Sequence, residues 1–232
     1  MKENHNLAVI VPAAGVGSRM QAEMPKQYIP LLGKPILSHT LDKLAQLDCI
    51  NHFMVAVSQQ DSYFNASFLP DSRFACCDGG KERADSVLLA LQALAPQQPD
   101  WVLVHDAARP LVDLTDIERL ILACLQQQQG GILAAKVKDT IKRGAHLVSE
   151  TVPRADLWQA FTPQMFPYHM LLQALQSGLQ AGANITDEAS AMELAGETVQ
   201  LVTARTDNLK ITTPEDLPLA EFIIQQQGKQ DD

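Results

Sequence analysis

The sequence lacks several features that define other classes of protein. It contains no apolar run long enough to cross a bilayer. Positive charge is scarce: 18 lysines and arginines stand against 27 aspartates and glutamates, a net charge of −9. This balance argues against extended binding of nucleic acid, although a few local cations would suffice for one nucleotide. Residues 2–6 are polar and lead directly into an apolar run, so we expect neither a signal peptide nor a membrane partner.

Cysteine is also rare, and reactive pairs are missing. The four cysteines show no metal-type spacing, so we expect buried, small apolar side chains in a reducing compartment and a cytoplasmic protein. They are Cys49, Cys76, Cys77 and Cys124. No Ser/His or Cys/His pair stands out, which disfavours catalysis through a covalent intermediate on a side chain.

Strand-like and helix-like segments alternate along the chain, whose length suits one substantial core. This alternation predicts one domain over 1–232: an α/β fold with a Rossmann-like, mostly parallel twisted sheet and helices on both faces. Strands are expected at 7–11, 53–57, 74–77, 101–104, 132–137 and 199–203. Helices are expected from 35 and at 83–95, 114–128, 168–180 and 214–227.

One segment departs from the alternation. Residues 138–152 are polar, with a turn signal at Lys142-Arg143-Gly144, and predict a hairpin that stands away from the sheet. Residues 153–167 are expected to be irregular. We therefore expect an arm at about 138–163, inserted within the domain.

The segment 8–20 is the most informative part of the sequence. An apolar run is followed by a loop of small residues that includes Gly15 and Gly17, and then by Arg19 and Lys26. Glycines let backbone N–H groups close around phosphates, and the two cations would face a polyphosphate. A plain strand-to-helix turn is the alternative, but the cations favour a nucleoside triphosphate site.

Two better-known phosphate loops are excluded at the same place. The dinucleotide fingerprint needs a third glycine where this chain has Met20, which also disfavours a dehydrogenase. The kinase-type loop ends in Gly-Lys-Ser/Thr, whereas this one ends Gly17-Ser18-Arg19.

Four more polar sets follow expected strands or lie in the arm. The segment 78–86 would let a flat base approach backbone groups, or it is only a turn with a helix cap near Asp85. Asp106 follows an apolar strand, where a Mg²⁺ ligand is often placed, with Arg109 close by; a turn residue is the alternative. His105 is expected to be structural.

The remaining two sets are weaker. Spacing alone favours a solvated hairpin for the arm set, which is Lys138, Thr140, Arg154 and Thr162. Lys210 would be a further phosphate cation. Asp207 would be a second metal ligand or a residue of a surface turn.

Together these motifs resemble, in order and over nearly the whole chain, the cytidylyltransferases of isoprenoid synthesis. The matching segments are 12–20, 25–28, 79–80, 83–87, 105–110, 139–142, Arg154, 162–164, 186–188 and 207–212. The resemblance implies Mg²⁺-dependent transfer of CMP from CTP to methylerythritol phosphate, with Mn²⁺ left open as the metal. It also implies a homodimer in which the arm completes the partner's site.

The same resemblance assigns roles to individual residues. The catalytic set is Arg19, Lys26, Arg154 and Lys210. The CTP-binding set is Pro12, Ala13, Ala14, Gly15, Gly17, Gly80, Arg83 and Ser86. The acceptor-binding set is Asp106, Arg109, Thr140, Arg154, Thr162, Thr186 and Lys210. Asp106 and Asp207 are the expected metal ligands.

Other assignments of the function differ first in the acceptor and in the base of the nucleotide. Ribitol 5-phosphate would pair with the same cations, and the hydroxyl pattern needs an activity comparison to decide. A sugar-1-phosphate transferase that uses UTP or dTTP is disfavoured by the segment 79–86. From a different class, a nucleotide-binding regulator would bind CTP without releasing pyrophosphate.

Overall fold

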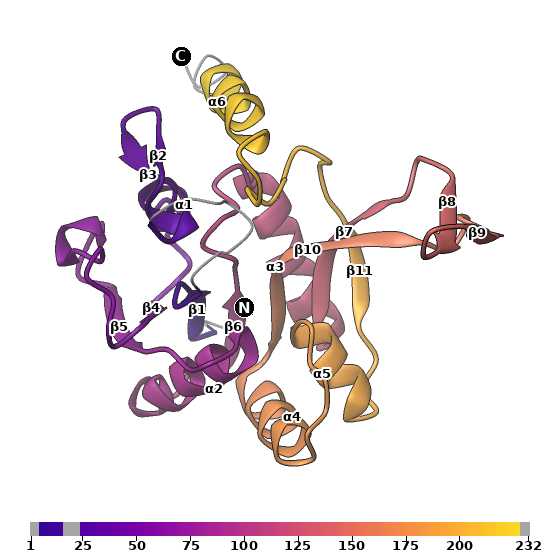
Figure 1. Cartoon of the computed structure of the whole chain (residues 1–232). Helices are drawn as coiled ribbons and strands as arrows, with labels where there is room; N and C mark the ends of the chain where they lie inside the picture. Colours follow the sequence, from indigo (N-terminus) through magenta and orange to yellow (C-terminus); the bar gives the residue numbers. More distant parts are fainter. Residues whose placement is uncertain (1–4, 16–23, 228–232) are drawn as a thin grey trace.

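A seven-stranded sheet with strand order β11-β7-β10-β6-β1-β4-β5 forms the centre of the molecule (Figure 1). The structure, a computed structural model, describes residues 5–15 and 24–227. The strands of this sheet are β1 Leu7–Pro12, β4 His52–Val57, β5 Phe74–Asp78, β6 Trp101–Val104, β7 Gly131–Lys136, β10 Trp158–Pro167 and β11 Gln200–Thr203. Only β10 runs antiparallel to its neighbours β6 and β7, so the expected mostly parallel sheet is confirmed.

Helices cover both faces of this sheet, because its strands are apolar on both sides. In β1, Leu7, Val9 and Val11 pack into one core, and Ala8 and Ile10 pack into the other. The first core includes side chains of α1 Ile36–Ala45 and α3 Leu114–Gln127. The second includes those of α2 Arg83–Ala93, α4 Tyr168–Gln180 and α5 Glu188–Leu194. No helix of the described part of the chain is long and apolar enough to span a membrane.

A smaller third core joins α6 Asp216–Gln227 to the short ladder of β2 Pro30–Leu31 and β3 Lys34–Pro35. Ile211 is completely buried in this core, and its N–H donates to the carbonyl of Ala108 at 2.9 Å. This bond fixes the segment before α6 against the loop that follows β6.

The predicted strands and helices are confirmed to within two residues at their boundaries, but β10, α5 and the short ladder of β2 and β3 were missed. Residues 153–167 were expected to be irregular, which is wrong for 158–167, where β10 lies at the middle of the sheet. A proline within a run normally argues against a central strand, and here Pro163 lies where the ladder shifts register between Ala160 and Gln164. Helix α5 spans only seven residues, too short for a clear helical period.

The projecting hairpin is confirmed, with corrected boundaries. It consists of β8 Ile141–Gly144 and β9 Val148–Val152, which stand away from the sheet on the right of Figure 1. The expected turn at 142–144 lies within β8, and the chain reverses at 145–147. The expected end at 163 is also wrong, because residues 158–163 belong to β10 of the central sheet. We call residues 138–157 the arm.

The cysteine prediction holds only in part. All four are free thiols, but only Cys124 is buried, and Cys49 and Cys76 are exposed. Cys76 lies on β5, the edge strand of the sheet, which explains why an apolar strand pattern did not imply burial there.

Candidate active site

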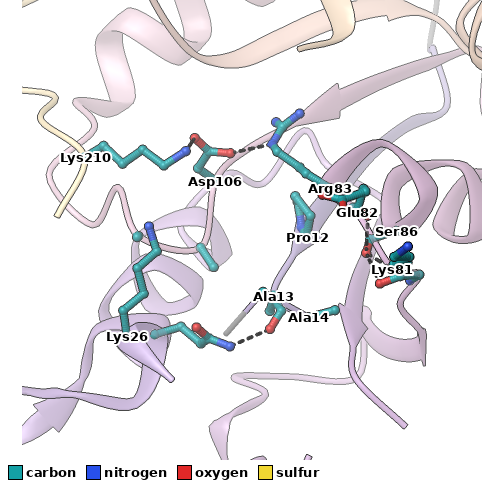
Figure 2. A pocket seen from close by; sticks show the side chains of 15 residues that line it. Pro12, Ala13, Ala14, Lys26, Lys81, Glu82, Arg83, Ser86, Asp106 and Lys210 are labelled. Atoms are coloured by element: carbon teal, nitrogen blue, oxygen red, sulfur yellow. Dashed lines mark hydrogen bonds and ion pairs between the residues drawn. The ribbon is translucent and has the colours of Figure 1, made fainter. Parts of the chain in front are cut away.

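A pocket of about 430 Å³ opens where the chain order of the sheet changes direction. From β1 the chain builds outward through β4 and β5, and then returns to place β6 on the other side of β1. The loops after β1, β5 and β6 diverge at this point, which is where open α/β sheets bind ligands. All three loops line the pocket, together with Lys26 and Lys210 (Figure 2).

Close backbone packing forms one wall of this pocket. A Cβ added at Gly79 would lie 2.3 Å from the Cβ of Ala14, so the loops after β1 and β5 meet only because residue 79 has no side chain. The N–H of Gly80 donates to Ser86 Oγ at 3.0 Å, and this hydroxyl donates to the carbonyl of Glu82 at 3.1 Å. Ala14, Gly80 and Ser86, all members of the expected CTP-binding set, therefore line this wall.

The helix-cap alternative for the segment 78–86 also describes a real feature. Glu82 is the N-cap of α2, and its N–H donates to the Asp85 carboxylate at 3.0 Å. The two interpretations are compatible, because the cap fixes the helix start while Gly80 and Ser86 line the pocket.

Lys26 reaches the pocket from a short 3₁₀ turn, Lys26–Tyr28. The buried side chain of Gln27 donates to the carbonyl of Ala13 at 2.6 Å, and the Tyr28 hydroxyl donates to Asp61 at 2.6 Å. Lys26 Nζ lies 3.5 Å from the carbonyl oxygen of Ile211, beside the segment that carries Lys210. Gln27 and Tyr28 thus fix the turn that points Lys26 into the pocket (Figure 2).

Three cations converge on the buried carboxylate of Asp106. Oδ1 accepts from Arg83 Nε at 2.9 Å, and Oδ2 lies 2.8 Å from Lys210 Nζ and 3.5 Å from Arg109 Nε. Arg83 also forms a two-pronged ion pair with the buried Glu188, at 2.6 and 3.1 Å. We call these five residues the charge cluster.

Both members of the Arg83–Asp106 pair stay charged at neutral pH. Burial alone would raise the pKa of the Asp106 carboxyl, but the charges of Arg83, Lys210 and Arg109 outweigh it and hold the pKa well below its usual range. Burial alone would lower the pKa of Arg83, but Glu188 and Asp106 raise it. Burial lowers the pKa of the Arg109 guanidinium, and the charge of Asp106 opposes this effect.

A second pocket of about 210 Å³ adjoins the first. Arg83, Asp106 and Lys210 line both pockets, so these three residues of the charge cluster form a shared wall. The other lining residues of the second pocket are Arg109, Ala160, Phe161, Thr162, Gln164, Thr186 and Asp187. The site can therefore hold two ligands side by side, with cations between them.

The structural interpretation of His105 is confirmed. Its side chain is completely buried, and its ring nitrogens lie 3.0 Å from the carbonyl of Arg109 and 3.1 Å from Thr162 Oγ1. The same hydroxyl of Thr162 accepts from the N–H of Asp106 at 3.0 Å. His105 thus ties the loop after β6 to strand β10.

We expect His105 to make folding sensitive to acid. Burial lowers the pKa of its imidazole from 6.5 to about 4. Between these values the unfolded chain binds a proton that the folded chain does not, so the free energy of unfolding falls as pH is lowered through this range. The contribution of this one residue reaches about 3 kcal/mol at the acid end. Urea unfolding at several pH values measures it.

The matched comparison uses two histidines. His105→Gln should be less stable than the wild type near neutral pH but should lose less stability on acidification. His146→Gln, at an exposed position of the arm, should follow the wild-type curve. An unchanged pH dependence in His105→Gln would contradict the assignment.

The other predicted site residues lie in three different places. Gly17 and Arg19 lie outside the described residues. Thr140 and Arg154 are exposed on the arm and line neither pocket; the Arg154 guanidinium contacts the carbonyl of Lys138. Asp207 also lies outside both pockets and pairs with Arg205, so the structure does not bring it to Asp106.

Three buried polar residues near the site had no predicted role. Besides Gln27 and Glu188, the amide of Gln164 donates to Asp187 at 2.9 Å and accepts from the N–H of Ala189 at 2.8 Å. Glu188 and Gln164 lie in segments that match the family pattern, which was the available signal. Their burial and partners were not visible in the sequence.

The acidic side chains of the site suit a metal ion that binds together with a phosphate ligand better than they suit a metal ion held by the protein alone. Asp106 and Glu82 are the acidic side chains that line the larger pocket, and no group of three His, Cys, Asp or Glu residues suited to a metal occurs in 5–15 and 24–227. Mg²⁺ commonly takes one or two carboxylates and completes its shell with phosphate oxygens and water. Asp106 alone meets that requirement.

Comparisons with known proteins agree with this geometry. A family model described as IspD: 2-C-methyl-D-erythritol 4-phosphate cytidylyltransferase matches residues 7–226. The protein of that name from Pseudoalteromonas translucida is 58% identical over 227 residues, covering 98% of this chain and 94% of the relative. Its namesake from Vibrio cholerae is 53% identical over 224 residues, covering 95% and 97%.

Solved structures lead to the same result. The crystal structure of the Francisella tularensis 2-C-methyl-D-erythritol 4-phosphate cytidylyltransferase matches with a TM-score of 0.82 at 36% identity, covering 94% of this chain and 99% of that one. The 4-diphosphocytidyl-2C-methyl-D-erythritol synthase of Anaerococcus prevotii gives 0.83 at 27% identity, covering 96% and 100%. This chain is a nucleotidyltransferase with an α/β fold. It belongs to the 2-C-methyl-D-erythritol 4-phosphate cytidylyltransferase (IspD) family of the isoprenoid pathway.

Proposed function

We propose that this enzyme transfers CMP from CTP to 2-C-methyl-D-erythritol 4-phosphate and releases pyrophosphate. The observation that carries the proposal is the shared wall of the two pockets, formed by Arg83, Asp106 and Lys210. A reaction between two phosphate-bearing ligands needs them side by side with positive charge between them, because the two anions repel each other. Family membership supports the choice of the two ligands.

The chemistry is an in-line displacement at the α-phosphorus of CTP. A phosphate oxygen of the acceptor attacks, a new P–O bond forms, and the bond to the leaving pyrophosphate breaks. The attacking oxygen is already anionic near neutral pH, so no general base is needed, in keeping with a structural His105. CTP would occupy the larger pocket, which we call the nucleotide pocket, and the acceptor would occupy the smaller one, the acceptor pocket. The protein aligns the ligands and offsets charge, with Lys26 in the nucleotide pocket, Arg109 in the acceptor pocket and Lys210 in both.

Mg²⁺ is part of the proposal, with Mn²⁺ as the alternative metal. When bound, the ion would neutralise and orient phosphate oxygens, and Asp106 is the residue that would hold it. Lys210 and Arg83 already compensate the charge of this carboxylate, so its position is set before the metal and nucleotide arrive.

The arm supports a homodimer as part of the proposal. Thr140 and Arg154 lie on a hairpin that projects from the sheet, and they line neither pocket. They would reach an acceptor only in a second copy of the chain. A mixture of Lys26→Ala and Arg154→Ala proteins should then regain activity, because a mixed dimer contains one site with both residues intact. Sedimentation that finds a monomer at working concentration would contradict this part.

A cytoplasmic location also belongs to the proposal and is supported only by the free cysteines. The fraction of the enzyme recovered with the cytoplasm in a cell fractionation tests it.

The test of the reaction measures pyrophosphate release from CTP and Mg²⁺. Methylerythritol phosphate and ribitol 5-phosphate are offered separately, and UTP replaces CTP in a third assay. Release with CTP and methylerythritol phosphate is the expected result. Release only with ribitol phosphate would mean that the enzyme uses another acceptor. CTP binding without release in any of the assays would favour a nucleotide-binding regulator.

A further inference from the structure

Glu188 is a buried carboxylate with no role in the reaction proposed above. It is the first residue of α5, and only 1% of its surface is exposed. Both of its oxygens lie on the guanidinium of Arg83, Oε1 at 2.6 Å from Nη1 and Oε2 at 3.1 Å from Nη2. Glu188 lines neither pocket, so it does not itself meet a ligand there.

Arg83, in contrast, lines both pockets and is about one quarter exposed. Glu188 holds the end of its guanidinium, and Asp106 accepts from Nε at 2.9 Å. These three bonds occupy three of the five N–H donors of a guanidinium and leave two for a ligand. A planar fork held on two sides has little freedom to rotate, so the remaining donors keep a fixed direction.

The pair with Glu188 also decides how Asp106 is shared. Arg83 takes Oδ1, whereas Lys210 takes Oδ2 together with the more distant Arg109, so Arg83 and Lys210 do not compete for one oxygen. Without Glu188, the guanidinium would be free to turn end-on toward Asp106, its other nearby carboxylate, and to compete with Lys210. The orientation of two residues of the shared wall therefore depends on a third that lies behind it.

We propose that Glu188 is a positioning residue: it fixes Arg83 at the wall between the nucleotide pocket and the acceptor pocket and thereby sets the geometry in which both ligands are held. The inference rests on the proposed function for its activity readout. The positioning itself depends on the contact between Glu188 and Arg83, which lie 105 positions apart in the chain.

The first test is Glu188→Gln, which keeps the size of the side chain and removes its charge. We expect kcat/KM for both substrates to fall about 10- to 100-fold, the usual effect of losing a group that orients a site residue. Glu193→Gln, at an exposed position of the same helix, is the matched control and should stay within twofold of wild type. Wild-type kinetics in a folded Glu188→Gln protein would overturn the proposal.

The second test separates positioning from general support of the fold. In an Arg83→Ala background Glu188 has nothing left to position, so adding Glu188→Gln should cost no further activity. It should also raise Tm there, because it removes an unpaired buried charge, whereas in the wild-type background it should lower Tm. Equal losses of activity and Tm in both backgrounds would overturn the proposal.

Two provisions keep the outcome decisive. If Arg83→Ala does not fold, Arg83→Gln serves as the background, since its neutral side chain fills part of the space but leaves the charge of Glu188 uncompensated. If the wild-type enzyme releases no pyrophosphate in the assay, the proposed function fails. The reversal of the Tm change needs no substrate and still decides whether Glu188 acts through Arg83.

Discussion

Replacement of Lys26 by alanine is expected to lower turnover about 100- to 1000-fold while the protein remains folded. Lys26 lines the nucleotide pocket on a turn that Gln27 and Tyr28 anchor independently, so loss of its amine should not move the backbone. A donor that meets charge developing on a leaving group contributes roughly 3 to 4 kcal/mol to the transition state. Pyrophosphate release under saturating substrates measures the effect.

The control for this experiment is Lys34→Ala, which removes an exposed lysine that pairs with Asp42. Its turnover should match the wild type, since Lys34 lines neither pocket. Lys26→Arg keeps the charge and should recover part of the activity. If Lys26→Ala retains near-normal turnover with an intact circular dichroism spectrum, its assigned role is wrong.

Replacement of Asp106 by asparagine is expected to remove activity and to destabilise the fold. The amide cannot compensate Arg83, Lys210 and Arg109, which then lie around one site without their common anion. Loss of one partner of a largely buried ion pair costs about 3 kcal/mol or more. We expect turnover to fall at least about 100-fold, since the same carboxylate is the expected metal ligand.

Added anions distinguish the cause of this destabilisation. Inorganic pyrophosphate should raise the Tm of Asp106→Asn more than that of the wild type, because it replaces the missing negative charge. Asp42→Asn, in an exposed pair, should change the free energy of unfolding by no more than about 1 kcal/mol. If pyrophosphate shifts both proteins equally, repulsion among the three cations is not the cause.

Most of the sheet and of the nucleotide pocket could be predicted from the sequence because their signals are local. The apolar run of β1 and the small residues after it lie within a few positions of each other. The burial pattern of a parallel strand requires apolar side chains on both faces, and this produces a continuous run that is easy to recognise. Asp106 was expected in the pocket for the same reason, because it comes soon after such a strand, and it does line the pocket. Lys26 also lines the pocket, but from a separate 3₁₀ turn, and it was singled out by its charge.

The missed features depend on contacts between distant parts of the chain. Strand β10 contains Pro163 and a shift of register, so its local pattern resembled a loop, and only its pairing with β6 and β7 makes it a strand. Asp207 was expected as a second metal ligand or a residue of a surface turn, and it pairs with Arg205 and lines neither pocket. The partner of Glu188 lies on another helix, and no local pattern indicates it.

The position of β10 has a consequence for how an assembly would affect the site. The first residues of this strand, Trp158 to Ala160, pair with β7 at the base of the arm, and Thr162 and Gln164 a few residues later line the acceptor pocket. One strand therefore runs from the base of the arm to the place where the acceptor would lie. A displacement of the arm's base would thus reach the acceptor pocket along β10 itself, without involving any helix.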